Sequence, residues 1–248
     1  WNPTHIGGYD PAYFLEFVAE GKKKISYAAS LGTDYIDSRY KDDIERALST
    51  FTSISIREKS AKPAVEELVE GPVEVVLDPT LLLKKEDYDE IKVRSKIKEP
   101  YILVYAIERN PELAKFANKI SVALGLPLIQ RRPGLKLVNE LEPFYTADTG
   151  EFLGLVESAE YVITNSFHGT VFALLYGKPF VSMLHSDTGS RTEDLLQQLD
   201  LSSHILYDLE DFDDFNIFRY DDVEDVRRRI EELKESSLDF LKEALGVN

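Results

Sequence analysis

The sequence predicts an α/β protein with two parallel-sheet domains, and three observations support this fold class. Strand-like apolar runs alternate with amphipathic helical segments along the chain. The runs are apolar at successive positions, which is typical of parallel strands covered by helices on both faces. A charged stretch near 85–98 separates a first set of strands from a second. We therefore expect one domain over 1–95 and another over 96–248, which includes the C-terminal helix.

The composition is that of a folded globular protein. The chain has 248 residues, of which 43% are hydrophobic and 30% charged, and this excludes a disordered polypeptide. No apolar run reaches the roughly 18 residues of a membrane-spanning helix. No charged-then-apolar signal peptide opens the chain. We therefore expect no transmembrane segment.

Charge and cysteine content exclude several further classes. Lys and Arg total 29 against 45 Asp and Glu, so the net charge is −16, which disfavours nucleic acid as a partner. Cysteine is absent, which excludes disulfides and thiolate metal sites. The four histidines lack the spacing of a metal-binding motif, and we expect no metal. A protein this acidic that binds an anion has to concentrate its cations locally.

In the first half of the chain, short apolar runs end at breaking residues. The strand over 24–30 ends at Gly32, the strand over 52–56 stops at Arg57, and Asp78 closes a third strand over 73–77. A segment with helical spacing over 11–21 precedes the first strand, and segments with such spacing over 42–50 and 61–69 separate the three strands.

In the second half, the clearest element is a helix over 111–124, with proline in its first turn and Gly125 as its stop. Glu and Arg at three- and four-residue spacing predict a long helix over 223–245. The acidic composition of segment 208–214 predicts a solvent-exposed loop between two elements. The remaining predicted strands cover 101–105, 126–129, 161–164 and 180–184, and the remaining helices 151–159, 170–176 and 192–199.

The segment 162–180 places a polar turn between an apolar strand and an apolar helix. Ligands of open α/β sheets bind beyond the carboxyl ends of the strands, where this turn would lie. The start of the following helix favours a bound phosphate, and His168 could donate to it or carry a proton. A capped helix with an incidental histidine is the alternative. The residues expected to line the ligand are Asn165, Ser166, Phe167, Gly169 and Thr170.

Three arginines near strand ends are candidate anion ligands. Arg57 and Arg131 each follow a predicted strand, and Arg191 precedes a helix. A guanidinium at such a place can bind a carboxylate or a phosphate through two hydrogen bonds. An ion pair with an acid such as Glu58, or a solvated loop, is the alternative. Ser30, at the end of the first strand, leaves room for a ligand but also suits a tight turn.

Taken together, these segments resemble the polysaccharide pyruvyl transferase family. They occur in the family's order across nearly the whole chain, and "ITNSFHGT" followed by "KPF" is the most specific. The stretches that carry the resemblance are "WNP", "KKISYAASLG", "FTSISIREKS", "VEVVLDPTLLL", "EFLGLVESAEYVITNSFHGTVFALLYGKPF" and "SRTEDLLQQLDL".

The resemblance implies a fold and an activity. It implies two Rossmann-like domains facing a cleft, as in glycosyltransferases of the GT-B type. It implies transfer of the enolpyruvyl part of phosphoenolpyruvate to a saccharide as a pyruvate ketal, without a cofactor, in bacterial cell-surface polysaccharide synthesis. His168 and Arg57 match a histidine and an arginine of the family's donor site. A cytoplasmic enzyme is expected, peripheral at the inner membrane face if its acceptor is lipid-linked.

The chain departs from the family in two respects. Family members normally carry a further N-terminal segment, so the N-terminal domain is expected to be incomplete. Some members have a basic residue where Ser166 stands, and the phosphate would then depend on Arg57, Arg191 or backbone amides. Two other functions stay open: a GT-B-type glycosyltransferase that uses a nucleotide sugar, and a non-catalytic sugar- or anion-binding module.

Overall fold

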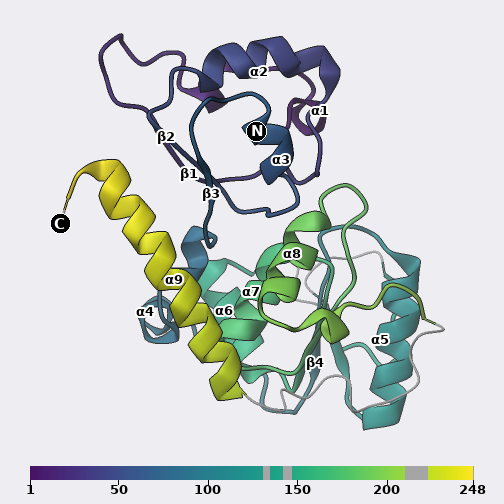
Figure 1. Ribbon diagram of the computed structural model, residues 1–248. Helices are drawn as coiled ribbons and strands as arrows, with labels where there is room; N and C mark the ends of the chain where they lie inside the picture. Colours follow the sequence, from purple (N-terminus) through teal and green to yellow (C-terminus); the bar gives the residue numbers. More distant parts are fainter. Residues whose placement is uncertain (131–134, 142–146, 210–222, 248) are drawn as a thin grey trace. The chain divides into compact units, whose positions relative to one another are not determined.

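A computed structural model describes residues 1–130, 135–141, 147–209 and 223–247 (Figure 1). The chain divides into two compact units, and each is described by itself. Unit 1 comprises Trp1–Leu82, Asp187–Leu195 and Arg227–Asn248, and unit 2 comprises Leu83–Ser186 and Leu196–Val226. Each unit contains a parallel sheet with helices, which confirms the predicted α/β class. The cleft between two domains and the boundary at 95/96 stay predictions.

Unit 1 is built on a three-stranded parallel sheet of order β1-β2-β3. Its strands are β1 (Ile25–Ala29), β2 (Ser53–Ile56) and β3 (Val73–Val75). Its helices are α1 (Pro3–Ile6), η1 (Pro11–Phe14), η2 (Ser38–Tyr40), α2 (Lys41–Leu48), α3 (Lys62–Glu66) and η3 (Pro79–Leu81).

The core of unit 1 lies on one face of this sheet. Ile54 and Ile56 of β2 pack in one buried cluster with Ile44 of α2 and Val65 of α3. Their spacing of two residues directs both side chains to the same face. Ser55 lies between them and points to the opposite face, where its hydroxyl donates to the carbonyl of Ser26 at 2.9 Å.

Unit 2 contains a four-stranded parallel sheet of order β5-β4-β6-β7. Its strands are β4 (Ile102–Tyr105), β5 (Leu128–Gln130), β6 (Tyr161–Thr164) and β7 (Phe180–Ser182). Its helices are α4 (Lys85–Asp89), α5 (Pro111–Leu124), α6 (Thr149–Ser158), α7 (Phe167–Leu175) and η4 (Ser202–His204). Two helices, α8 (Ser190–Gln198) and α9 (Val223–Leu245), contain residues of both units.

Helices cover both faces of the second sheet. Val104 and Ile163 lie in the core cluster with Phe116 of α5. Tyr105 comes next along β4 and therefore points to the other face, where its ring lies 4.6 Å from that of Phe152 in α6. Among the described residues, no helix combines the length and apolar composition needed to cross a membrane.

The predicted elements are largely confirmed, and three need correction. The helix predicted over 11–21 is only the 3₁₀ turn η1, which ends because Leu15 adopts a left-handed φ of 55°. The charged stretch near 85–98 begins with a helix, α4, that the sequence did not indicate. Helix α7 starts at Phe167 rather than at Thr170, so His168 lies inside its first turn.

Candidate functional site

His168 is the one exposed residue in an otherwise buried segment. Every other residue from 161 to 174, through β6 and most of α7, is buried. The adjacent Phe167 is only 5% exposed, and its ring centroid lies 5.3 Å from that of the imidazole in an edge-on contact. The fold therefore presents a titratable group at the carboxyl end of β6, where α/β proteins bind their ligands.

Asn165, a predicted ligand residue, connects two strand ends in the structure. Its Oδ1 accepts a hydrogen bond from the backbone N–H of Ile107 at 2.9 Å. Its Nδ2 donates to the carbonyl of Glu108, also at 2.9 Å. The side chain is 2% exposed, so its amide holds the turn after β4 against the turn after β6.

The other polar residues of this turn are buried as well. The hydroxyl of Ser166 caps α7 by accepting the N–H of Gly169 at 3.2 Å. Gly169 is required because a Cβ there would lie 2.3 Å from Thr164 Oγ1. Thr170 is fully buried, and its hydroxyl lies 2.6 Å from that of Ser182 in β7. These three residues hold the segment that presents His168, and their roles as ligands stay predictions.

A second histidine lies at the same edge of this sheet, paired with an acid that the sequence analysis missed. His185 follows β7, and its Nε2 lies 3.4 Å from Oε2 of Glu108, which follows β4. The same carboxylate oxygen accepts the backbone N–H of Ser186 at 2.9 Å. Both side chains are partly exposed, 19% for His185 and 28% for Glu108. Only their positions directly after strands could have pointed to them.

In unit 1, Arg57 lies at the carboxyl end of β2, as predicted. Its Nε donates to the carbonyl of Ala28 at 3.1 Å, and its Nη1 forms an ion pair with the nearly buried carboxylate of Asp78. Asp78 in turn accepts hydrogen bonds from the backbone N–H and the hydroxyl of Thr80. Ala28 adopts a left-handed φ of 51° where the register of β1 and β2 shifts. These contacts orient the guanidinium, which is 20% exposed.

Arg191 lies close to Arg57. It donates through Nη2 to the hydroxyl of Thr188 at 2.9 Å. Burial and repulsion by Arg57 lower the pKa of Arg191, while attraction by Glu58 and Asp78 opposes that shift. A further negative group beside these two guanidinium groups would relieve their mutual repulsion, so the pair suits an anionic ligand.

Ser30 and Glu58 complete this cluster of unit 1. The hydroxyl of Ser30 donates to the Glu58 carboxylate, which also accepts the N–H of Leu31 at 3.3 Å. Glu58 is fully buried, and burial raises the pKa of its carboxyl against the opposing effects of these hydrogen bonds and of Arg57. Ser30 therefore has a structural partner, and its role as a ligand residue stays a prediction.

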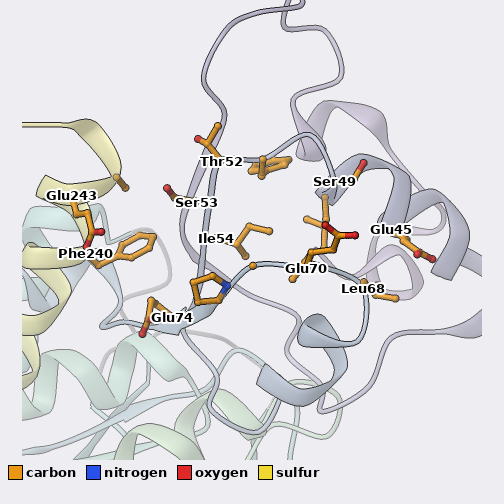
Figure 2. Close-up of a pocket in the computed structure, with 16 residues that line it drawn as sticks. Glu45, Ser49, Thr52, Ser53, Ile54, Leu68, Glu70, Glu74, Phe240 and Glu243 are labelled. Atoms are coloured by element: carbon orange, nitrogen blue, oxygen red, sulfur yellow. The ribbon is translucent and has the colours of Figure 1, made fainter.

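A cavity of about 540 Å³ lies at the other end of the first sheet, where strands β2 and β3 begin (Figure 2). It is lined by Thr52 and Ser53 at the start of β2, and by Phe240 of α9. Four carboxylates surround it, those of Glu45, Glu70, Glu74 and Glu243. An anionic ligand would be repelled there, so the arginine cluster is the better place for one.

The two clusters have different chemistry. Unit 1 offers two guanidinium groups, and unit 2 offers two imidazoles at strand ends. Arg57 and His168 belong to different units, so their predicted sharing of one pocket stays a prediction. Arg131 lies outside the described residues. Within the described part of the chain, no group of three or more His, Asp or Glu residues could hold a metal ion.

These features define the class as an α/β protein that carries arginine, histidine and carboxylate side chains beyond the carboxyl ends of its parallel strands. The family model "Polysaccharide pyruvyl transferase" matches residues 4–187. The chain therefore belongs to the polysaccharide pyruvyl transferase family, as its sequence motifs predicted. A search of curated proteins found no match.

Solved structures show weaker likeness. Thermobaculum terrenum O-GlcNAc transferase is 15% identical, with a TM-score of 0.45 over 90% of this chain and 47% of that protein. A Listeria monocytogenes protein described as a UDP-N-acetylglucosamine 2-epimerase is 14% identical, with a TM-score of 0.43 over 79% of this chain and 52% of that one. The chain thus spans about half the length of these structures.

Proposed function

We propose that this protein transfers the pyruvyl group of phosphoenolpyruvate to a saccharide as a ketal, in the synthesis of a bacterial cell-surface polysaccharide. The observation that carries the proposal is the exposed His168 in an otherwise buried segment within the family match. The pair of Arg57 and Arg191 adds support, because the donor carries a carboxylate and a phosphate that both need cations.

The chemistry assigns a role to each group. Phosphoenolpyruvate is an enol phosphate, and its methylene carbon must be protonated so that a sugar hydroxyl can attack the neighbouring carbon. His168 supplies that proton, since an imidazole changes charge near neutral pH. Arg57 and Arg191 hold the carboxylate and the phosphate. Phosphate then leaves, a second hydroxyl closes the ketal, and the sequence of steps requires no cofactor.

The test is phosphate release from phosphoenolpyruvate in the presence of saccharide acceptors. The His168→Gln variant should lose roughly 100- to 10,000-fold in turnover, the usual contribution of a general acid. Its affinity for phosphoenolpyruvate, measured by calorimetry, should change much less. Lys115→Gln is the matched control, because this exposed lysine on α5 pairs only locally with Glu112 in the described structure. Unchanged turnover in His168→Gln would refute its role.

Ligand-dependent stability separates the other functions. Stabilisation by uridine diphosphate but not by phosphoenolpyruvate would favour a glycosyltransferase that uses a nucleotide sugar. Stabilisation by saccharides without any turnover would favour a non-catalytic binding module. A lipid-linked acceptor would bring this cytoplasmic enzyme to the inner face of the membrane, and comparing free with lipid-linked acceptors tests that point.

A further inference from the structure

We propose that His185 is the general base that takes the proton from the attacking acceptor hydroxyl, and that Glu108 is its positioning residue. This inference rests on the proposed function and concerns unit 2 alone. It assigns a role to two residues that the donor chemistry leaves unused.

The first step of ketal formation needs two proton transfers, one from the protein to the substrates and one from the substrates to the protein. The methylene carbon of the donor gains a proton while the acceptor hydroxyl loses one. A single imidazole cannot begin the step both protonated and neutral. The proposed acid, His168, therefore needs a partner that starts as a neutral base.

His185 lies beyond the strand that neighbours the one leading into His168. Strands β6 and β7 are adjacent and parallel, with Thr164 opposite Ser182. Beyond this pair, His168 follows by four residues and His185 by three. The N–H of Met183 still donates to the carbonyl of Thr164 at 2.9 Å, so the two chains remain paired as they leave the sheet.

Glu108 connects the segments that follow three of the four strands, β4, β6 and β7. Its backbone carbonyl accepts the amide of Asn165, which follows β6. Its carboxylate accepts the N–H of Ser186 and lies 3.4 Å from Nε2 of His185, beyond β7. The carboxylate faces Nε2 of the imidazole, and we assign the ring proton to that nitrogen. The lone pair of that tautomer lies on Nδ1, which is the atom that acts as base.

The proposed steps balance. The acceptor hydroxyl gives its proton to Nδ1 of His185 as its oxygen bonds to C2 of the donor, and the C2–C3 π electrons take a proton from His168. The C2–O bond to phosphate then breaks with its electron pair on phosphate, which receives the proton held by His185. The second hydroxyl bonds to C2 and gives its proton to His168. Both imidazoles return to their starting states.

The experiment measures turnover and chemical rescue in the full chain. His185→Gly should reduce phosphate release roughly 100- to 10,000-fold, the range for loss of a general base. Its dissociation constant for phosphoenolpyruvate should stay within about threefold, because the base contacts the acceptor rather than the donor. Added imidazole should restore activity to His185→Gly in a concentration-dependent way. His185→Gln serves as a second variant if the glycine variant does not fold.

Glu108 should respond differently. Glu108→Gln keeps an oxygen for the Ser186 N–H but removes the charge that orients His185, so we expect a loss of roughly tenfold or more in kcat that imidazole does not rescue. Glu112→Gln is the matched control, since Glu112 is an exposed carboxylate nearby in sequence, paired with Lys115. It should leave turnover unchanged.

The outcomes distinguish the two proposals. Wild-type turnover together with near-normal turnover in His185→Gly and His185→Gln would overturn this inference and leave the proposed function intact. Low turnover of His185→Gly without rescue by imidazole would reduce His185 to a structural role. If the wild-type protein released no phosphate from its donor with any acceptor, both proposals would fall.

Discussion

The strand ends of the two units differ in the groups they expose. In unit 1, Arg57 and Arg191 are held by local oxygen acceptors and repel each other. In unit 2, His168 and His185 stand at adjacent strand ends, and Glu108 is the nearby acid. The carboxyl-terminal side of the sheet in unit 1 thus carries permanent positive charge. The corresponding side of the sheet in unit 2 carries titratable imidazoles. Under the proposed function, unit 1 would hold the anion and unit 2 would move the proton.

Among changes in ligand affinity and stability, replacing Arg57 should give the largest effect, and it tests whether the arginines of unit 1 bind an anion. Arg57→Gln removes a charge that pairs with the nearly buried Asp78, and we expect phosphoenolpyruvate affinity to fall by about 100-fold, within the range for truncated charge pairs. Calorimetric titration measures it. Arg39→Gln is the control, because Arg39 is an exposed arginine of the same unit. Equal affinities of both variants would contradict the assignment.

Gly169→Ala tests how tightly unit 2 holds its histidine. The new Cβ would lie 2.3 Å from Thr164 Oγ1 and 2.8 Å from Tyr105 Cδ1, so the helix start must shift. We expect unfolding free energy to fall by about 1–3 kcal/mol, as for other overpacked cores. Urea unfolding measures this loss. Gly71→Ala is the control, because a Cβ at Gly71 would meet nothing within 4 Å, and it should lower the unfolding free energy far less. A similar loss in both variants would argue against the close approach of Gly169 to Thr164.

The buried Glu58 predicts a pH-dependent stability in unit 1. Its pKa in the folded state is raised above the reference value of 4.5, so the unfolded chain loses this proton first as pH rises. The protonated Glu58 carboxyl therefore stabilises the folded state at low pH. This stabilisation is lost as pH increases from about 4.5 through the pKa of the folded state. Glu58→Gln should gain stability relative to wild type between pH 4 and pH 7, measured by urea unfolding. A pH-independent difference would count against a burial penalty.

The smallest effect is expected at Asp89 in unit 2. Hydrogen bonds from Lys85 and Lys92 lower the pKa of Asp89 to about 2. The stability that ionised Asp89 adds is present above the reference value of 3.8 and is lost as pH falls towards 2. Solvent and salt screen this partly exposed group, so the contribution is small. Asp89→Asn should change the melting temperature at pH 7 only slightly, and less in high salt. A large, salt-independent change would contradict this view.

Local signals in the sequence predicted much of the fold. Helix α5 has the predicted bounds because Asn110 caps its start, Pro111 suits its first turn, and Gly125 ends it with a left-handed φ of 65°. The ends of the strands were also predicted well enough to place Arg57 and His168 at sheet edges. Helix caps and strand ends depend on residues only a few positions apart in the chain, so they can be recognised from the sequence alone.

The roles of single polar residues were harder to predict. Asn165 and Ser166 were expected to contact a ligand, and that stays a prediction; what the sequence did not indicate is that both are buried and hydrogen-bonded within the protein. The pairing of Glu108 with His185 was missed, since the two residues belong to strand ends that only the order of the sheet brings together.

By itself, the sequence determined the α/β class, the family and the strand ends that carry the candidate residues, because composition, periodicity and motifs are local properties. Only the tertiary structure decided which polar side chains the protein uses internally and which it exposes, as with Asn165 and His168. The physical reason is that hydrogen-bond partners and burial depend on contacts between segments distant in sequence, and strand order in the sheet sets those contacts.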